Sequence, residues 1–223
     1  MPLSTQVLIV GAGPTGLALA ITLARQGIQF VIVDKLDRGQ NTSRAAVVHA
    51  HTLEMLDSLG VSDHLVREAI KLQRFSICDR DRTLMRLAFD QLPTRHPYLL
   101  MITQDVTERI LEQCLAGTGY QVQRGFTAES LRQDADGVYA IVRARDGRSH
   151  TIRARYAVGA DGMHSVVREA AGIGFQGDTE SNSYLLADVA MQWSLGRDEV
   201  RLFFSPAGLL VVAPLIAMTD CRS

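Results

Sequence analysis

The chain has 223 residues, of which 47% are hydrophobic and 21% are charged, and its formal net charge at pH 7 is −1. This composition is typical of a globular protein with one large domain, or one domain and part of another, and the balanced charge predicts no nucleic-acid surface. The three cysteines, Cys78, Cys114 and Cys221, are widely separated and show no C-x-x-C spacing, so neither a disulfide framework nor a zinc site is indicated.

The first stretch of the chain is apolar and has no charged residue before Arg25. It is not typical of a signal peptide or a membrane span, because it lacks a positive leading region and is interrupted by Pro14 and several glycines. We therefore expect a cytoplasmic protein with no membrane association.

A glycine-rich motif follows the first predicted strand, Val7–Val10. It reads Gly11-Ala12-Gly13-Pro14-Thr15-Gly16, the pattern G-x-G-x-x-G, and opens a predicted helix. In this pattern the first glycine allows a tight turn, the second lets the backbone approach a pyrophosphate, and the third lets the helix pack closely on the strand. The helix N-terminus then presents N–H groups and a positive dipole end to the phosphates. The motif predicts a dinucleotide site.

The second predicted strand supports the same interpretation. Phe30–Val33 is apolar and ends at Asp34, about 20 residues beyond the glycines, where a carboxylate can accept hydrogen bonds from a ribose. The alternative is a glycine-rich turn in an unrelated α/β domain, but the combined spacing of strand, glycines, helix and acid favours the dinucleotide site. A polar loop is expected at Lys35–Ser43.

Hydrophobic periodicity predicts further elements between residues 50 and 115. In chain order they are a helix over Ala50–Leu59 ended by Gly60, a helix from Ser62 through Ile70, a hairpin of Phe75–Ile77 and Leu84–Leu87, a strand over Leu99–Thr103, and a helix with one apolar face from Val106 to Leu115.

The last hundred residues are rich in predicted strands. A β-meander is expected, with turns at Asp136-Gly137 and Asp146-Gly147, and a buried run, Tyr156–Val158, follows it. Beyond Gly177 the pattern changes to that of antiparallel strands. We therefore expect two domains, residues 1–174 and 175–223. The meander strands are expected at about 128–133, 138–145 and 151–157, and the later strands at 184–191, 199–204 and 209–214.

Four separated motifs together resemble those of one family. They are Gly11–Gly16 with Asp34, Ser43-Arg44-Ala45 with the following Leu53-Glu54-Met55-Leu56, Gln104, and Gly159–Arg168, which reads G-A-D-G-M-H-S-V-V-R. Over nearly the whole chain, they resemble the N-terminal half of the class A flavoprotein monooxygenases, the family of para-hydroxybenzoate and phenol hydroxylases. The resemblance implies an α/β fold: a Rossmann-like FAD-binding domain with a parallel sheet and β-meander, then the start of an antiparallel β substrate domain.

The resemblance also implies reactants and site residues. FAD would be the bound cofactor, NADPH or NADH the reductant, and O2 and a small aromatic substrate the other reactants, with a homodimer among the possible assemblies. Asp161 would lie beside the flavin pyrophosphate, Arg44 would pair with its oxygens, and Gln104 would hydrogen-bond the cofactor. The cofactor-binding residues implied are Gly11, Gly13, Pro14, Thr15, Gly16, Asp34, Lys35, Arg44, Gln104, Ala128, Asp161 and Gly162.

Purely structural roles are open for several of these residues. Asp161-Gly162 also fits a turn in which Ser165 caps a helix beginning near Val166. Arg168 fits either a salt bridge to Asp161 or a cofactor contact, Arg44 fits a solvated loop, and Gln104 fits a polar helix cap. Asp34 and Lys35 stand where the family more commonly has glutamate and arginine; both keep the charge, although lysine lacks the planar donor fork.

The C-terminal part departs from the family pattern. Family members continue well beyond this length and carry a later Gly-Asp motif that binds the flavin ribityl chain, whereas Gly177-Asp178 comes too early and lacks the small residues that follow it. We expect the adenosine half of an FAD site without the redox half, and we name no catalytic residue and no metal ligand. The expected function is an FAD-dependent aromatic monooxygenase, whole or truncated. The alternatives are a non-catalytic dinucleotide-binding remnant and an NAD-linked Rossmann dehydrogenase.

Overall fold

The computed structural model describes residues 3–37, 39, 47–178, 183–192, 196–206 and 208–216. The contacts between Cα atoms divide the chain into two compact units. Unit 1 comprises Met1–Thr42 and Gln104–Glu180, and unit 2 comprises Ser43–Thr103 and Ser181–Ser223. The chain therefore leaves unit 1 and returns to it, and this division does not follow the expected boundary at residue 174.

Unit 1 is built on one six-stranded sheet with the order β8-β2-β1-β11-β10-β9. The first four of these strands run parallel, and β11, β10 and β9 form an antiparallel meander. The predicted parallel sheet and the predicted meander are both confirmed, as parts of a single sheet. The bounds are β1 Leu3–Val10, β2 Phe30–Asp34, β8 Gln123–Arg124, β9 Phe126–Asp134, β10 Gly137–Ala144 and β11 Ser149–Gly159.

Strand β11 joins the two halves of this sheet. Its first part pairs with β10, and from Ile152 to Gly159 it pairs in parallel with β1. Tyr156–Val158, expected as a separate buried run, is the end of this same strand, and its Tyr156 side chain is 58% exposed. Because Val10 pairs with Gly159, the two glycine motifs of the sequence leave the sheet at neighbouring strand ends.

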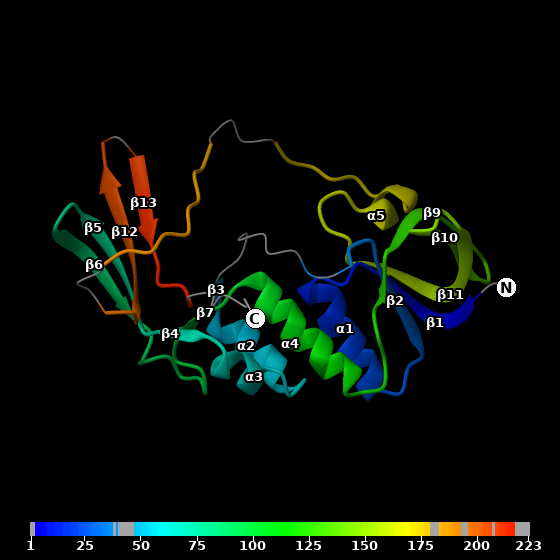
Figure 1. Ribbon diagram of the computed structural model, residues 1–223, viewed down its shortest axis with the longest axis horizontal. Helices are drawn as coiled ribbons and strands as arrows, with labels where there is room; N and C mark the ends of the chain where they lie inside the picture. Colours follow the sequence, from blue (N-terminus) through cyan, green and yellow to red (C-terminus); the bar gives the residue numbers. More distant parts are fainter. Residues whose placement is uncertain are drawn as a thin grey trace. The chain divides into compact units, whose positions relative to one another are not determined.

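The two faces of the parallel strands are covered by different elements. Helices α1 (Pro14–Arg25) and α4 (Gln104–Ala116) pack against each other, and α1 also contacts β1 and β2 (Figure 1). On the other face, Leu8 and Val10 share a core cluster with Val142 of the meander, because alternate residues of a strand point to opposite faces. Helices thus cover one face of the parallel strands, and residues of the meander pack on the other.

The described residues of unit 2 form two smaller sheets and two short helices. The sheet orders are β13-β12-β5-β6 and β3-β7-β4. The predicted hairpin of residues 75–87 is confirmed as β5 and β6, and β12 pairs with β5 in parallel. This pairing groups the C-terminal strands with residues 43–103. The bounds are β3 Val47–Val48, α2 Ala50–Asp57, α3 Ser62–Arg67, β4 Ile70–Leu72, β5 Arg74–Asp79, β6 Arg82–Ala88, β7 Leu99–Met101, β12 Glu199–Ser205 and β13 Gly208–Val212.

Two secondary-structure predictions differ from the structure. The strand expected at residues 184–191 does not form: this stretch has no regular structure, and Leu185 is 98% exposed. An apolar run becomes a strand only where another strand pairs with it, and none does among the described residues. The helix expected through Ile70 ends at Arg67, because Ile70 begins β4 and pairs with β7. In the described part of the chain, no helix is long and apolar enough to cross a membrane.

Candidate functional site

The glycine turn lies between the ends of three parallel strands. The Gly11 N–H donates to the Val33 carbonyl at 2.8 Å, and the Ala160 N–H donates to the Val10 carbonyl at 2.7 Å. Gly11 has φ +101°, and a Cβ there would collide with the Ala160 carbonyl oxygen and lie 2.8 Å from the Asp161 nitrogen. The backbone of one motif therefore touches the backbone of the other, an approach that only glycine allows.

The other two glycines of the turn have different surroundings. A Cβ on Gly16 would collide with the Gly11 carbonyl oxygen and lie 3.3 Å from the Ala160 Cβ, which confirms its expected role in close helix packing. A Cβ on Gly13 would meet only the Glu108 Oε1 atom, at 3.9 Å. Helix α1 begins at Pro14, and no described side chain caps it. First-turn N–H groups that no side chain caps are suited to bind an anion.

Asp34, at the end of β2, holds the glycine turn through its carboxylate. Oδ2 accepts a hydrogen bond from the Ala12 N–H at 2.6 Å, and Oδ1 accepts one from the Leu36 N–H at 2.8 Å. A carboxylate has about four acceptor positions, so two remain after these bonds. Asp34 therefore braces the turn, a role not anticipated from the sequence, and keeps acceptor capacity for the predicted ribose contact.

Asp161 is oriented by the short helix α5 (Val166–Ala170). Its Oδ1 accepts from the Ser165 hydroxyl at 2.5 Å and its Oδ2 from the Val166 N–H at 2.7 Å, while Ser165 Oγ accepts from the Arg168 N–H at 3.0 Å. Gly162 has φ +80°. The turn-and-cap interpretation of this motif is therefore confirmed.

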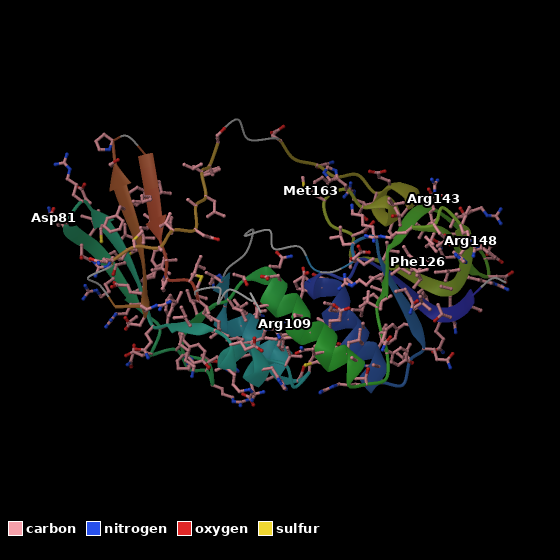
Figure 2. All side chains as sticks on the ribbon, viewed as in Figure 1. Asp81, Arg109, Phe126, Arg143, Arg148 and Met163 are labelled. Atoms are coloured by element: carbon pink, nitrogen blue, oxygen red, sulfur yellow. The ribbon has the colours of Figure 1, made fainter. Side chains whose placement is uncertain are left out.

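Arg168 does not pair with Asp161. Its guanidinium donates to the Met163 carbonyl at 2.9 Å and lies 4.5 Å from the centre of the Phe175 ring. The salt bridge to Asp161, one of the two roles open to Arg168, is thus not formed; its guanidinium also lies 3.9 Å from the Glu169 carboxylate. The cofactor contact stays a prediction. Met163, which carries the carbonyl that Arg168 bonds, is labelled in Figure 2.

The first turns of α4 bring a buried acid to the glycine turn. Gln104 begins the helix, and its Nε2 donates to Glu108 Oε1 at 2.8 Å. Glu108 is only 7% exposed, and burial raises the pKa of its carboxyl. Sequence reasoning missed Glu108. The available signal was its i, i+4 spacing from Gln104, which places both side chains on one helix face.

Arg124 is a second residue that the sequence did not reveal. Strand β8 pairs with β2 so that Arg124 lies opposite Asp34. Its guanidinium contacts Glu112 Oε2 at 2.7 Å and lies 3.7 Å from Asp34 Oδ1, and its side chain is 15% exposed. No sequence signal could have found it, because β8 has only two residues and its register depends on the fold.

Comparison with known proteins identifies the family. Residues 4–205 match the family described as FAD binding domain. The chain belongs to this family. It is 38% identical over 211 residues to 6-methylpretetramide 4-monooxygenase of Streptomyces rimosus, covering 94% of this chain and 38% of that protein. It is 34% identical over 213 residues to pentachlorophenol 4-monooxygenase of Sphingobium chlorophenolicum, covering 94% of this chain and 40% of that protein.

A solved structure shows the same fold. The anhydrotetracycline hydroxylase OxyS from Streptomyces rimosus has a TM-score of 0.71 and 36% identity, covering 79% of this chain and 36% of that chain. The present chain spans about two fifths of the length of the curated relatives it matches. It is thus similar to the FAD-binding portion of larger monooxygenases.

Three further residues of this FAD-binding domain were predicted to bind the cofactor, and each has a different position. Lys35 is exposed directly after β2. The Ala128 side chain is buried in the core cluster, so only its backbone is available to a ligand. Arg44 lies outside the described residues.

An open groove of about 410 Å³ runs along α4 within unit 1. Arg109, one of its lining residues, is labelled in Figure 2. The lining residues are Gly39, Asp105, Glu108, Arg109, Glu112, Gln113 and Ala116.

Proposed function

We propose that this chain forms the FAD-binding part of a monooxygenase that hydroxylates a phenolic or other aromatic substrate with NADPH or NADH and O2. The observation that carries the proposal is the meeting of the Gly11–Gly16 turn, Asp34 and Asp161 at the ends of three adjacent parallel strands. Ligands of open α/β sheets bind at the carboxyl ends of the strands. The two relatives named above, a 6-methylpretetramide and a pentachlorophenol monooxygenase, support the substrate class.

The proposed site assigns a task to each part of this edge. The turn and the α1 N-terminus receive the pyrophosphate through N–H groups and the helix dipole. Asp34 accepts from the ribose, and Asp161 lies beside the pyrophosphate, held by α5. Bound FAD supplies hydride acceptance and oxygen activation, while the chain binds it, orients it and excludes water. Lys35, Arg44, Gln104, Ala128 and Gly162 complete the proposed set.

The proposal also includes the cellular compartment and the oligomeric state of the protein. We place it in the cytoplasm, in accord with widely spaced cysteines that suggest no disulfide framework. We also keep a homodimer as a prediction, to be checked by light scattering of the purified chain with and without FAD.

Titration of the purified chain with FAD tests the proposed function. We expect saturable quenching of flavin fluorescence, a yellow protein after gel filtration, and bleaching by NADPH or NADH that reverses in air. Binding without bleaching would favour the non-catalytic remnant. Binding of NAD with no binding of FAD would contradict the proposal and favour the dehydrogenase alternative, against which the family match already argues.

A further inference from the structure

Glu108 lies beside the glycine turn, where the cofactor phosphates are proposed to bind. Its Oε1 is 3.9 Å from the position of a Cβ on Gly13, and a Cβ on Gly39 would collide with its Oε2. The carboxyl is thus held between the turn and Gly39, away from solvent, with only 7% of the residue exposed. A buried carboxylate is costly unless it is well paired, so its partners decide its charge.

Two acids, one cation and one amide act on Glu108. Asp34 acts on it from β2, Asp105 from its own helix, and Arg124 from β8, while Gln104 donates the amide hydrogen bond. The guanidinium of Arg124 bonds Glu112, one turn further along α4, rather than Glu108. Burial, with Asp34 and Asp105, raises the carboxyl pKa, and this outweighs the lowering by Gln104 and Arg124.

We propose that Glu108 takes up a proton when FAD binds, so that the site presents a neutral carboxyl to the flavin pyrophosphate. The inference rests on the proposed FAD site. The two negative charges of a pyrophosphate beside the turn disfavour a further negative charge there. The proton comes from solvent and adds to a carboxylate oxygen of Glu108, which then offers an O–H donor as well as an acceptor. The affinity for FAD is therefore coupled to the protonation of Glu108.

Calorimetry of the wild-type chain tests the proton directly. FAD binding is measured at a series of pH values from acidic to alkaline, each in two buffers with different ionisation enthalpies, and the difference in observed heat gives the protons bound. We expect net uptake of up to one proton per FAD. Because the bound carboxyl has the higher pKa, uptake occurs between the free and bound pKa values. The dissociation constant therefore rises with pH in that range, about tenfold for each unit by which binding raises the pKa.

A pair of variants assigns the effect to this residue. Glu108→Gln keeps the shape and is neutral at every pH, so we expect FAD affinity independent of pH and at least as tight as wild type in alkaline buffer. Glu129→Gln removes the same charge from β9, where Glu129 pairs with Arg143, and should keep the wild-type proton uptake and pH profile. Thermal unfolding checks that both variants fold.

The outcomes separate this inference from the proposed function. If wild type does not bind FAD, the proposed function fails first and the inference with it. If wild type binds FAD without proton uptake, or if a folded Glu108→Gln binds more weakly at all pH values, FAD binding stands and the inference is overturned. The second result would mean that the ionised carboxylate supports the site. Uptake that persists in Glu108→Gln would assign the proton to another group and overturn it too.

Discussion

Two glutamates of this chain are equally buried yet behave in opposite ways. Glu108 in unit 1 and Glu199 in unit 2 are each 7% exposed. Burial raises the pKa of both carboxyls, and at Glu108 that effect prevails. At Glu199, hydrogen bonds from Ser76 and Arg201 and the charges of Arg201 and Arg86 outweigh burial and lower the pKa. Burial alone therefore does not decide the charge of a carboxyl; its partners do.

The two regions also differ in what holds them together. Around Glu199, Arg201 donates through Nε at 3.1 Å and Nη2 at 2.9 Å to the same carboxylate oxygen, and Ser76 donates to the other. Around Glu108, the neighbouring turn is shaped by the close backbone approach of Gly11 to Ala160. Glu199 is thus hydrogen-bonded to a cation, whereas Arg124, the cation that acts on Glu108, bonds Glu112 instead.

The largest effect is expected where backbone contact shapes the flavin-site region. Gly11→Ala forces a side chain into positive φ and into the Ala160 carbonyl, which should cost on the order of 4 kcal/mol of unfolding free energy and abolish FAD binding. Gly147→Ala is the matched control, because Gly147 has φ +82° with nothing within 4 Å of a Cβ. It should lose only about 1 kcal/mol, from backbone strain. Equal losses in urea unfolding of the two variants would refute the contact argument.

A smaller but still large effect is expected when Glu199 loses its hydrogen-bonded cation. Arg201→Gln removes the guanidinium that donates twice to one oxygen of this buried carboxylate, and it should destabilise the protein by about 3 kcal/mol. The double variant Arg201→Gln with Glu199→Gln should recover part of this loss, because the uncompensated charge is removed. Urea unfolding of wild type, both single variants and the double variant measures the coupling. Strict additivity would show that the pair does not act as one unit.

The smallest effect is expected in the pH dependence of folding stability, to which the two glutamates contribute with opposite sign. Glu199 has a lowered folded pKa, so its contribution to stability is present above the unfolded value of 4.5 and is lost as pH falls through the folded pKa. Glu108 has a raised pKa in the folded protein. Its contribution to stability is therefore fully present below the unfolded pKa of 4.5 and is lost as pH rises through the folded pKa.

Melting temperatures across acidic and neutral pH check this contrast. Glu199→Gln should flatten the acid side of the wild-type profile, and Glu108→Gln should flatten the loss above pH 4.5. The two changes should have opposite signs, because the pKa of Glu199 is lowered and that of Glu108 is raised on folding. If both variants altered the same side of the profile, the contrast between the two regions would not hold.

Local signals were enough for the residues whose role depends on chain neighbours. Gly11 and Gly16 were predicted because a strand, a tight turn and a helix impose their spacing directly. Ser165 was predicted as a cap because capping acts over three residues. The stretch at 184–191 was mispredicted as a strand, because strand formation needs a partner that local composition does not provide.

By itself, the sequence determined the dinucleotide turn, the order of most helices and strands, and the likeness to flavoprotein monooxygenases, all of which depend on short-range spacing. Only the tertiary structure decided which distant groups meet. Parallel pairing of β1 with β11 brings Ala160 against Gly11. Pairing of β8 with β2 brings Arg124 opposite Asp34. Helix α4 packs on α1, and its Glu108 lies beside Gly13. Register and helix packing are set by the whole core, and so is the charge of the acid beside the turn.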